Sequence, residues 1–340
     1  MTAYNSLTLR NILNYLKANN MKTFASILQF AKEFDTDAKC REYLEQQRWN
    51  GVPTCPHCGS TNVHRFPNGI IFKCRAKECR KKFSVTVGTV YQDRKLPLHK
   101  IFLAVYVLSV HSKGISALQL SNLLDISLKA AWLLNHKVRA MLTEKGAPQL
   151  LNGIVEVDET YVGGKEKNKH NSKRTTKTPT KNLLTQGKGF ATWHDTKTPV
   201  FGLLQRDGIV RVQKVENAKG KTLIPIMVAN VSPEAVIYSD EHTGYFRLKA
   251  AGLKHDTVQH NKGEYVRGKV HTQSIEGFWS LLKRQIVGIH HSVSPKHLQR
   301  YAGESAWRYN NRKLTQDERF ATVLGNCNGS LTYNELIADN

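Results

Sequence analysis

Hydrophobic and polar positions change their period several times along the chain, and each period predicts a different kind of element. Apolar side chains recur at helical spacing in residues 24–31, and a second short helix is predicted over 37–47. Residues 51–92 are rich in Cys, Gly and β-branched residues, which indicates short strands, and helical spacing returns over 96–145. The N-terminal half should therefore contain helices, a small sheet, and helices again.

A new pattern begins at Gly153, where apolar and polar residues alternate as they do in a strand. Strands are predicted over 154–158, 199–204, 208–215 and 235–239, and helices over 221–230 and 274–286. A closing helix is expected around Trp307 and Tyr309, and Trp279 and Leu282 should pack the preceding helix on the sheet. Strands and helices in this succession predict a domain with a mixed sheet.

The charge balance points to a polyanionic partner. Lys and Arg total 50 against 27 Asp and Glu, a formal net charge of +23, which suits nucleic acid first and an anionic membrane second. The longest apolar run, Ile101 to Leu108, is far shorter than the ~20 residues of a membrane span, and no export signal is visible. We therefore expect a cytosolic protein that binds DNA at the nucleoid.

Four cysteines have the spacing of a zinc site. Cys55 and Cys58 form a C-x2-C pair, and Cys74 and Cys79 form a C-x4-C pair after fifteen intervening residues. Two close pairs can supply the four thiolates of a tetrahedral structural Zn²⁺, which leaves no open position for catalysis. His57 and His64 remain possible substitutes for a cysteine. Basic residues crowd the second pair and suit phosphate contacts; the candidates there are Arg80, Lys81 and Lys82.

A helix-turn-helix is predicted after the zinc site. Ser116 is a helix N-cap candidate, and Ser127 should cap a second helix from Leu128 to Met141 after a short break. The basic residues of the second helix are DNA-contact candidates: Lys129, Lys137 and Arg139. Two helices packed in a bundle would give a similar pattern.

A polar stretch over 163–189 carries eight Lys or Arg residues and one acid. It cannot bury apolar area, so we expect a loop or arm. It is either a solvated insertion or an arm that grips DNA through residues such as Lys173 and Arg174.

Three acids occupy positions suited to a metal site. Asp158 lies in a predicted strand, Asp240 ends another, and Glu276 lies near the start of a helix. Acids at the ends of core strands are costly unless they are neutralised, and oxygen ligands favour Mg²⁺. Taken singly, each acid could equally be ordinary strand-end or turn polarity.

The chain resembles the DDE transposases of bacterial insertion sequences, specifically the ISXO2-like group with an N-terminal zinc ribbon. The resemblance covers about residues 24–312. Its landmarks are CREYLEQQRW, CPHC with CRAKEC, VEVDETYVGGKEKNKH, YSDEHTGY, HTQSIEGFWSLLKRQIVGIHH and LQRYAGESAWRYNNR. The thirty-five residues between Asp240 and Glu276 are typical of one large branch of these enzymes. Lys283 follows Glu276 by seven residues, so both side chains share a helix face.

The resemblance implies an α+β multidomain protein whose RNase H-like mixed-sheet catalytic domain follows a zinc ribbon and a helix-turn-helix. It implies a catalytic triad of Asp158, Asp240 and Glu276 that holds Mg²⁺ or Mn²⁺. It also implies that Lys283 binds a phosphate of the DNA. The expected parts are N-terminal helices (1–50), zinc ribbon (51–92), helix-turn-helix segment (93–150), catalytic domain (151–315) and C-terminal tail (316–340). Such enzymes cut at terminal inverted repeats, join the 3′ ends to target DNA, and act as homo-oligomers.

Two other functions remain open on the sequence. A DNA-binding regulator or domesticated transposase would bind DNA with an idle triad. A nuclease of the same fold would cut without joining.

Overall fold

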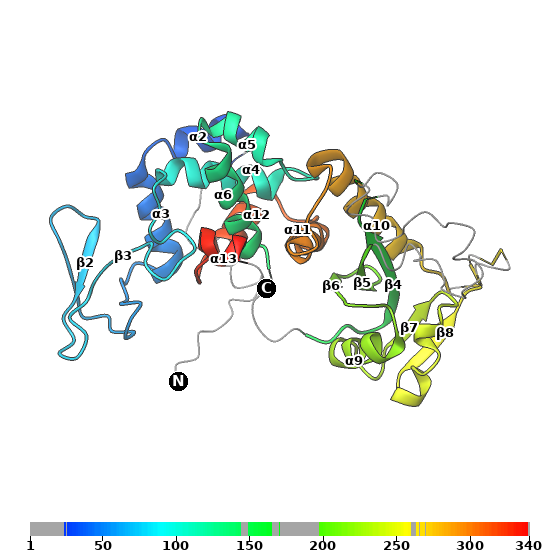
Figure 1. Ribbon diagram of the computed structural model, residues 1–340. Helices are drawn as coiled ribbons and strands as arrows, with labels where there is room; N and C mark the ends of the chain where they lie inside the picture. The colour runs from blue at the N-terminus through cyan, green and yellow to red at the C-terminus, as the bar shows by residue number, and fades with distance from the viewer. Residues whose placement is uncertain are drawn as a thin grey trace. The chain divides into compact units, whose positions relative to one another are not determined.

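The computed structural model describes residues 24, 26–143, 149–164, 170, 197–259, 263–264, 266–268 and 270–338. The chain divides into two compact units (Figure 1). One comprises Met1–Lys145 with Lys313–Asn340, and the other comprises Gly146–Arg312. Across the described residues, no helix has both the length and the apolar composition that a membrane span requires.

The first unit joins a small antiparallel sheet to a group of packed helices. Its helices are α2 (Ile27–Glu33), α3 (Asp37–Trp49), α4 (Leu98–Val110), α5 (Ala117–Leu124), α6 (Leu128–Met141), α12 (Gln316–Gly325) and α13 (Tyr333–Ile337). Its strands are β1 (Val63–Arg65), β2 (Ile71–Cys74) and β3 (Lys82–Ser84), paired in that order. The succession of helices, short strands and helices confirms the sequence prediction.

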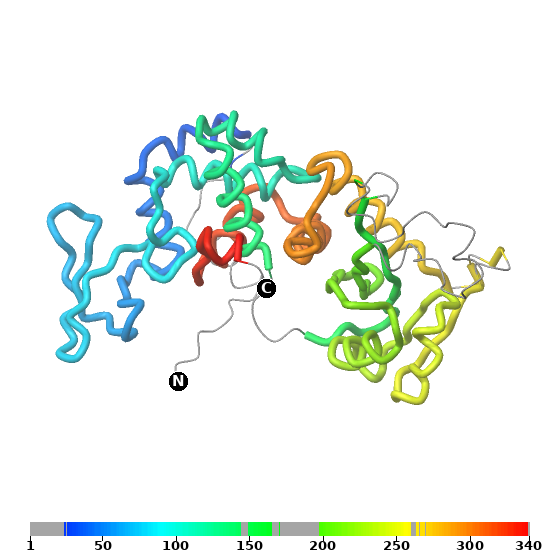
Figure 2. The backbone as a smooth tube through the Cα atoms, viewed as in Figure 1, coloured from blue at the N-terminus to red at the C-terminus, as the bar shows by residue number. Residues whose placement is uncertain are grey.

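The segment after residue 315 is not a tail, which corrects the expected division of the chain. The ring of Phe320 on α12 is fully buried and lies 4.9 Å from Phe30 and 5.7 Å from Phe102, measured between centroids. Val90 N also donates to Cys327 O at 2.9 Å. Helix α12 thus packs against the helices near the N-terminus and completes their core. Figure 2 shows the red end of the tube among the helices of the first unit.

The second unit is built on a five-stranded mixed sheet of order β6-β5-β4-β7-β8. Its strands are β4 (Ile154–Val162), β5 (Thr198–Gln205), β6 (Val210–Lys214), β7 (Val236–Ser239) and β8 (Lys254–Thr257). Strands β4, β5 and β6 are antiparallel neighbours, whereas β7 and β8 run parallel to β4. The predicted strands are confirmed, and β8 was not predicted.

Helices cover both faces of this sheet. They are α9 (Gly220–Asn230), α10 (Gln273–Gln285) and α11 (Leu298–Asn310), with a π turn at Ile286–His290 and short 3₁₀ turns at Thr243–Tyr245 and Lys249–Ala251. One apolar cluster includes Leu223 and Met227 of α9, and the other includes Trp279 and Leu282 of α10. The predicted packing of Trp279 and Leu282 on the sheet is confirmed. Because side chains alternate along a strand, successive residues of β4 face α9 and α10 in turn.

Candidate functional site

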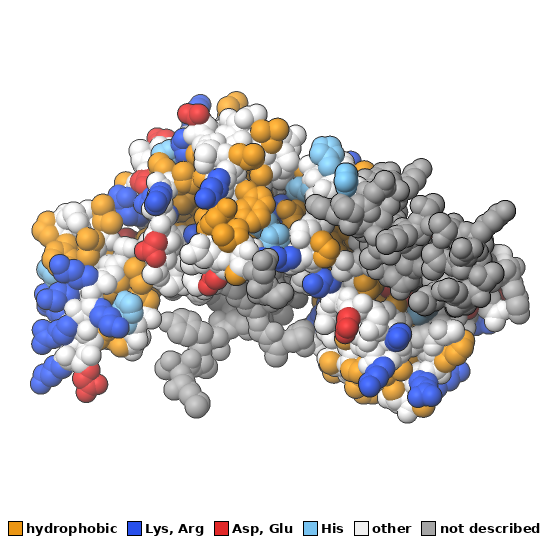
Figure 3. All heavy atoms as spheres, viewed as in Figure 1, with side chains coloured by type: hydrophobic (Ala, Val, Ile, Leu, Met, Phe, Trp, Pro, Cys, Tyr) orange, Lys and Arg blue, Asp and Glu red, His pale blue; other side chains and the backbone are white. Residues whose placement is uncertain are grey.

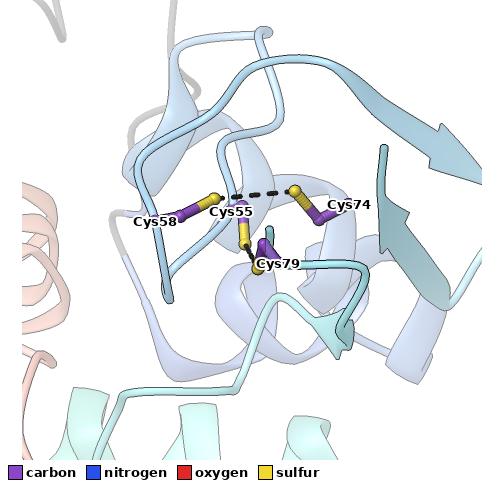
Figure 4. Close-up of side chains that lie close together, drawn as sticks. All are labelled: Cys55, Cys58, Cys74 and Cys79. Atoms are coloured by element: carbon purple, nitrogen blue, oxygen red, sulfur yellow. Dashed lines mark hydrogen bonds between the residues drawn. The ribbon is translucent and has the colours of Figure 1, made fainter. Parts of the chain in front are cut away.

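The four predicted cysteines meet at one point. Cys55 Sγ lies 3.7 Å from Cys79 Sγ, and Cys58 Sγ lies 3.6 Å from Cys74 Sγ. All four sulfur atoms lie within 4.8 Å of one another, and the side chains point toward a common centre in Figure 4. Zn–S bonds of about 2.3 Å in a tetrahedron place sulfur atoms about 3.8 Å apart, so this set supports a structural Zn²⁺.

The zinc site is anchored on the end of α3. Trp49 packs its ring 5.2 Å from Phe72 and 6.0 Å from Phe83, which belong to β2 and β3. The neighbouring Arg48 donates from Nη1 to Val87 O at 3.1 Å. These contacts couple the cysteine-bearing segment to the helical part of the first unit, so loss of the metal should also release this packing.

An exposed basic surface surrounds the second cysteine pair. Arg80, Lys81 and Lys82 are all exposed, and Lys82 Nζ lies 5.5 Å from the centre of the Phe66 ring. Lys and Arg side chains gather over this part of the chain in Figure 3. The surface can therefore meet phosphates without first unfolding any packed structure.

Two helices joined by a short link stand where the helix-turn-helix was predicted. Ser116 forms a capping box with Gln119 at the start of α5, and Asp125 ends that helix in the left-handed region at φ 49°. Ser127 then caps α6 by accepting from Ala130 N. The predicted caps and helix bounds are confirmed.

The three basic candidates on α6 have different surroundings. Lys129 is exposed, with its Nζ 4.2 Å from the centre of the Tyr333 ring. Lys137 is half-buried, and burial lowers its pKa. Both line a cavity of about 530 Å³ within the first unit. The Arg139 side chain is only 2% exposed, so it packs inside the helices and is not available to DNA, contrary to its selection as a contact residue. Lys173 and Arg174 lie outside the described residues.

Asp158 lies on β4, and Asp240 lies near it at the end of the neighbouring strand β7. In the parallel pair of β4 and β7, Glu156 stands opposite Tyr238. Asp158 lies two residues further along β4, and Asp240 lies two residues after Tyr238, directly after the end of β7. Continuing the register of the two strands brings both aspartates to the same place on the same face. Burial raises the pKa of Asp158 well above its usual range, and the Glu159 and Asp240 carboxylates raise it further. The two aspartates thus place oxygen ligands and negative charge together at one edge of the sheet.

A glycine and a tryptophan shape the wall beside Asp158. Trp279 of α10 donates from Nε1 to Asp158 Oδ2 at 3.0 Å. Opposite Asp158 on β5 stands Gly202, and a Cβ there would lie 2.6 Å from the Trp279 ring. The missing side chain therefore gives the indole room to reach the carboxylate. The sequence predicts only a packing role for Trp279, so its bond to Asp158 is a second role that the structure adds.

Glu276 and Lys283 are both exposed on α10, seven residues apart. Glu276 Oε1 accepts from Thr272 Oγ1 at 2.9 Å, one turn before. In the described ranges, the cysteine set is the one group of three or more His, Cys, Asp or Glu with mutually close ligand atoms. The structure therefore pairs Asp158 with Asp240 but does not gather Glu276 into a cluster of that tightness.

Two acids beside Asp158 were not selected from the sequence. Glu156 is fully buried and bonds to the start of α10, while Glu159 accepts from Tyr245 Oη and lies 3.1 Å from His242 Nδ1. The sequence holds one signal for these two acids, which is that several acids stand together in one apolar strand. A buried acid needs partners, so such a strand indicates polar contacts at its acids.

Two known protein families match this chain, one in each of its two compact units. The family model described as "Transposase zinc-ribbon domain" matches residues 35–82, and the model described as "ISXO2-like transposase domain" matches residues 150–310. No solved structure gives a significant match.

Two curated relatives come from an archaeon and a bacterium. The "Uncharacterized protein in transposable element ISH50" of Halobacterium salinarum is 30% identical over 274 residues, 79% of this chain and 90% of the relative. An "Uncharacterized transposase-like protein" of Haemophilus influenzae is 26% identical over 100 residues, 29% of this chain and 80% of that protein. The chain therefore belongs to the ISXO2-like transposase family, whose domain here follows a transposase zinc ribbon.

Proposed function

We propose that this transposase is a DDE enzyme, which cuts DNA at the ends of its element and joins the exposed 3′-hydroxyls to target DNA. The observation that carries the proposal is the place of Asp158 on β4 beside Asp240, which directly follows the neighbouring parallel strand β7 and whose carboxylate acts on the pKa of Asp158. The helix α10, which packs on the same face, brings Glu276 and Lys283. The strand order β6-β5-β4-β7-β8, antiparallel through β6, β5 and β4 and parallel beyond, supports an RNase H-like fold.

The donor set of this site suits Mg²⁺ or Mn²⁺. The site offers only carboxylate oxygens, from Asp158, Asp240 and Glu276, and hard divalent cations prefer such ligands. The Asp240 carboxylate raises the pKa of Asp158, and a bound cation would offset this repulsion between the two aspartates. A metal held there would supply activation of the attacking water or 3′-hydroxyl and stabilisation of the leaving oxygen. The aspartates would hold it, Glu276 would complete the ligand set, and Lys283 would bind a phosphate oxygen.

DNA binding would use the basic surfaces of the first unit. Arg80, Lys81 and Lys82 are exposed beside the zinc site, and Lys129 is exposed near the start of α6. In this proposal the ribbon contacts phosphates and α5 with α6 acts as the helix-turn-helix that recognises the terminal repeats. Lys137 would approach DNA from its half-buried position. Lys173 and Arg174 remain candidates from the sequence, and two bound ends imply a homo-oligomer.

The deciding experiment is a cleavage and strand-joining assay on DNA that carries the ends of the chain's own element. Wild type, Asp158→Asn, Asp240→Asn and Glu276→Gln are compared with Mg²⁺, and DNA binding is measured in parallel. We expect wild type to cut and join, and all three variants to bind but do neither. Cutting without joining would favour a nuclease, and binding without reaction by wild type would favour a DNA-binding regulator. Full activity of Glu276→Gln would remove Glu276 from the ligand set.

A further inference from the structure

Glu156 is a buried carboxylate that the proposed reaction does not use. Its side chain is 0% exposed, and it lies on β4 two residues before Asp158. Its Oε2 accepts from Ser274 N at 2.9 Å and from Ile275 N at 3.0 Å, and its Oε1 accepts from Ser274 Oγ at 3.0 Å. All three donors belong to the first turn of α10.

These bonds replace the missing cap of α10. The first amides of a helix have no intrahelical partner, and the N-cap residue usually accepts from one of them. The N-cap here is Thr272, whose side chain accepts from no amide of the first turn; its hydroxyl donates to Glu276. The carboxylate of a distant strand therefore binds the free amides, at the end of the helix dipole where negative charge is most favourable.

The carboxylate is itself fixed in place. Arg206 Nε donates to Glu156 Oε1 at 2.6 Å, and Arg206 Nη2 donates to His271 O at 2.9 Å. The arginine thus holds both the carboxylate and the backbone just before α10. A buried charge with this many donors is satisfied, but losing the charge would leave several donors without an acceptor.

We propose that Glu156 is a positioning residue, which sets the place of Glu276 relative to Asp158. The proposal rests on the proposed function, because it concerns the metal site of that reaction. One side chain joins the strand of the first aspartate to the helix turn that carries Glu276, and its two amide bonds end one residue before Glu276. Moving the start of α10 would move Glu276 while leaving Asp158 on β4 and Asp240 at the end of β7.

The test is Mn²⁺ binding to the zinc-loaded full chain, followed by electron paramagnetic resonance. Outer partners of metal ligands typically contribute about tenfold to a hundredfold in metal affinity. Glu156→Gln, which keeps shape but removes charge, should raise the Mn²⁺ dissociation constant by about that factor. Ser274→Ala, a milder change that keeps Glu156, should raise it less. The matched control is Glu304→Gln on α11, where an equally buried carboxylate pairs with Arg308 at 2.6 Å; this variant should leave Mn²⁺ affinity unchanged.

A double substitution separates positioning from general destabilisation. If Glu156 acts through Glu276, adding Glu156→Gln to Glu276→Ala should produce no further loss of Mn²⁺ affinity. Equal loss in both backgrounds would overturn the proposal, as would an equal effect of Glu304→Gln or wild-type affinity in Glu156→Gln. Strand joining by wild type is scored separately. If wild type does not join strands but the variants show the expected changes in Mn²⁺ affinity, the proposed reaction is wrong and the positioning role of Glu156 stands. If wild type joins strands but the variants do not show these changes in Mn²⁺ affinity, only the positioning role of Glu156 is wrong.

Discussion

Replacing Gly202 with alanine should disturb the wall of the aspartate site through one defined contact. A Cβ at this position would lie 2.6 Å from Cζ2 and 2.7 Å from Cη2 of Trp279, and 3.1 Å from Cδ1 of Ile275. Carbon atoms normally approach to about 3.5–4.0 Å, so the indole must retreat by about 1 Å. Trp279 is only 3% exposed and packed against the sheet, so it cannot swing into solvent without leaving a void.

The expected loss follows from two terms. Overpacking a core costs about 1–3 kcal/mol. A retreat of about 1 Å would also stretch the 3.0 Å bond from Trp279 Nε1 to Asp158 beyond hydrogen-bonding distance, which adds about 1 kcal/mol. We expect Gly202→Ala to lower the free energy of unfolding by about 3 kcal/mol.

Urea unfolding of the full chain, followed by tryptophan fluorescence, measures this loss. The control is Gly303→Ala on α11, where an added Cβ meets nothing within 4 Å and should stabilise the helix by up to about 1 kcal/mol. Combining Gly202→Ala with Trp279→Leu should recover part of the loss, because the smaller side chain removes the clash. An unchanged unfolding midpoint for Gly202→Ala, or a double variant less stable than the sum of the single changes, would refute the assigned contact.

Four further outcomes are expected. Cys74→Ser should release the zinc from the ribbon, detectable by metal analysis, together with a change in the fluorescence of Trp49; retained zinc would contradict the ligand set. Phe320→Ala should lower the free energy of unfolding in urea by about 3–5 kcal/mol. A near-neutral result would mean that α12 is not part of the core of the first unit. Replacing Lys81 and Lys82 with glutamine should weaken DNA binding for all sequences alike and lower the slope of log affinity against log salt by about 2, whereas a change in sequence preference would argue for base contacts. Ser116→Ala should cost about 1 kcal/mol through loss of the capping box, and no change in unfolding free energy would mean that this cap is redundant.

Features set by neighbouring residues could be predicted from the sequence. The helix from Leu128 to Met141 was predicted with both bounds correct, because Ser127 caps it by a bond to an amide three residues away. The strand at β4 followed from its alternation. The C-terminal helices could have been found by the same rule, since Thr315 with Glu318 and Thr332 with Glu335 each form a capping box.

Features that depend on distant partners could not be predicted. A basic side chain on a helix gave no sign of the surface that would cover it, and Arg139 proved to be buried beside Val138 on the inward side of α6. Its position eight residues after the buried Ala131 was a weak signal, because that spacing keeps a residue on the same helix face. The pairing of Asp158 with Asp240 likewise depends on how β4 and β7 align across about eighty residues of intervening chain.

Strand β4 organises the whole candidate site because its acids leave the sheet in opposite directions. Glu156 and Asp158 point to the face of α10, where Glu156 holds the amides that start that helix. Glu159 points to the other face and binds Tyr245 Oη and His242 Nδ1, which follow Asp240 in the chain. The His242 amide in turn donates to Asp240 Oδ1 at 3.0 Å. One strand therefore presents the first aspartate and fixes both segments that carry the other two proposed ligands, so a register shift of one residue in β4 would misplace all three.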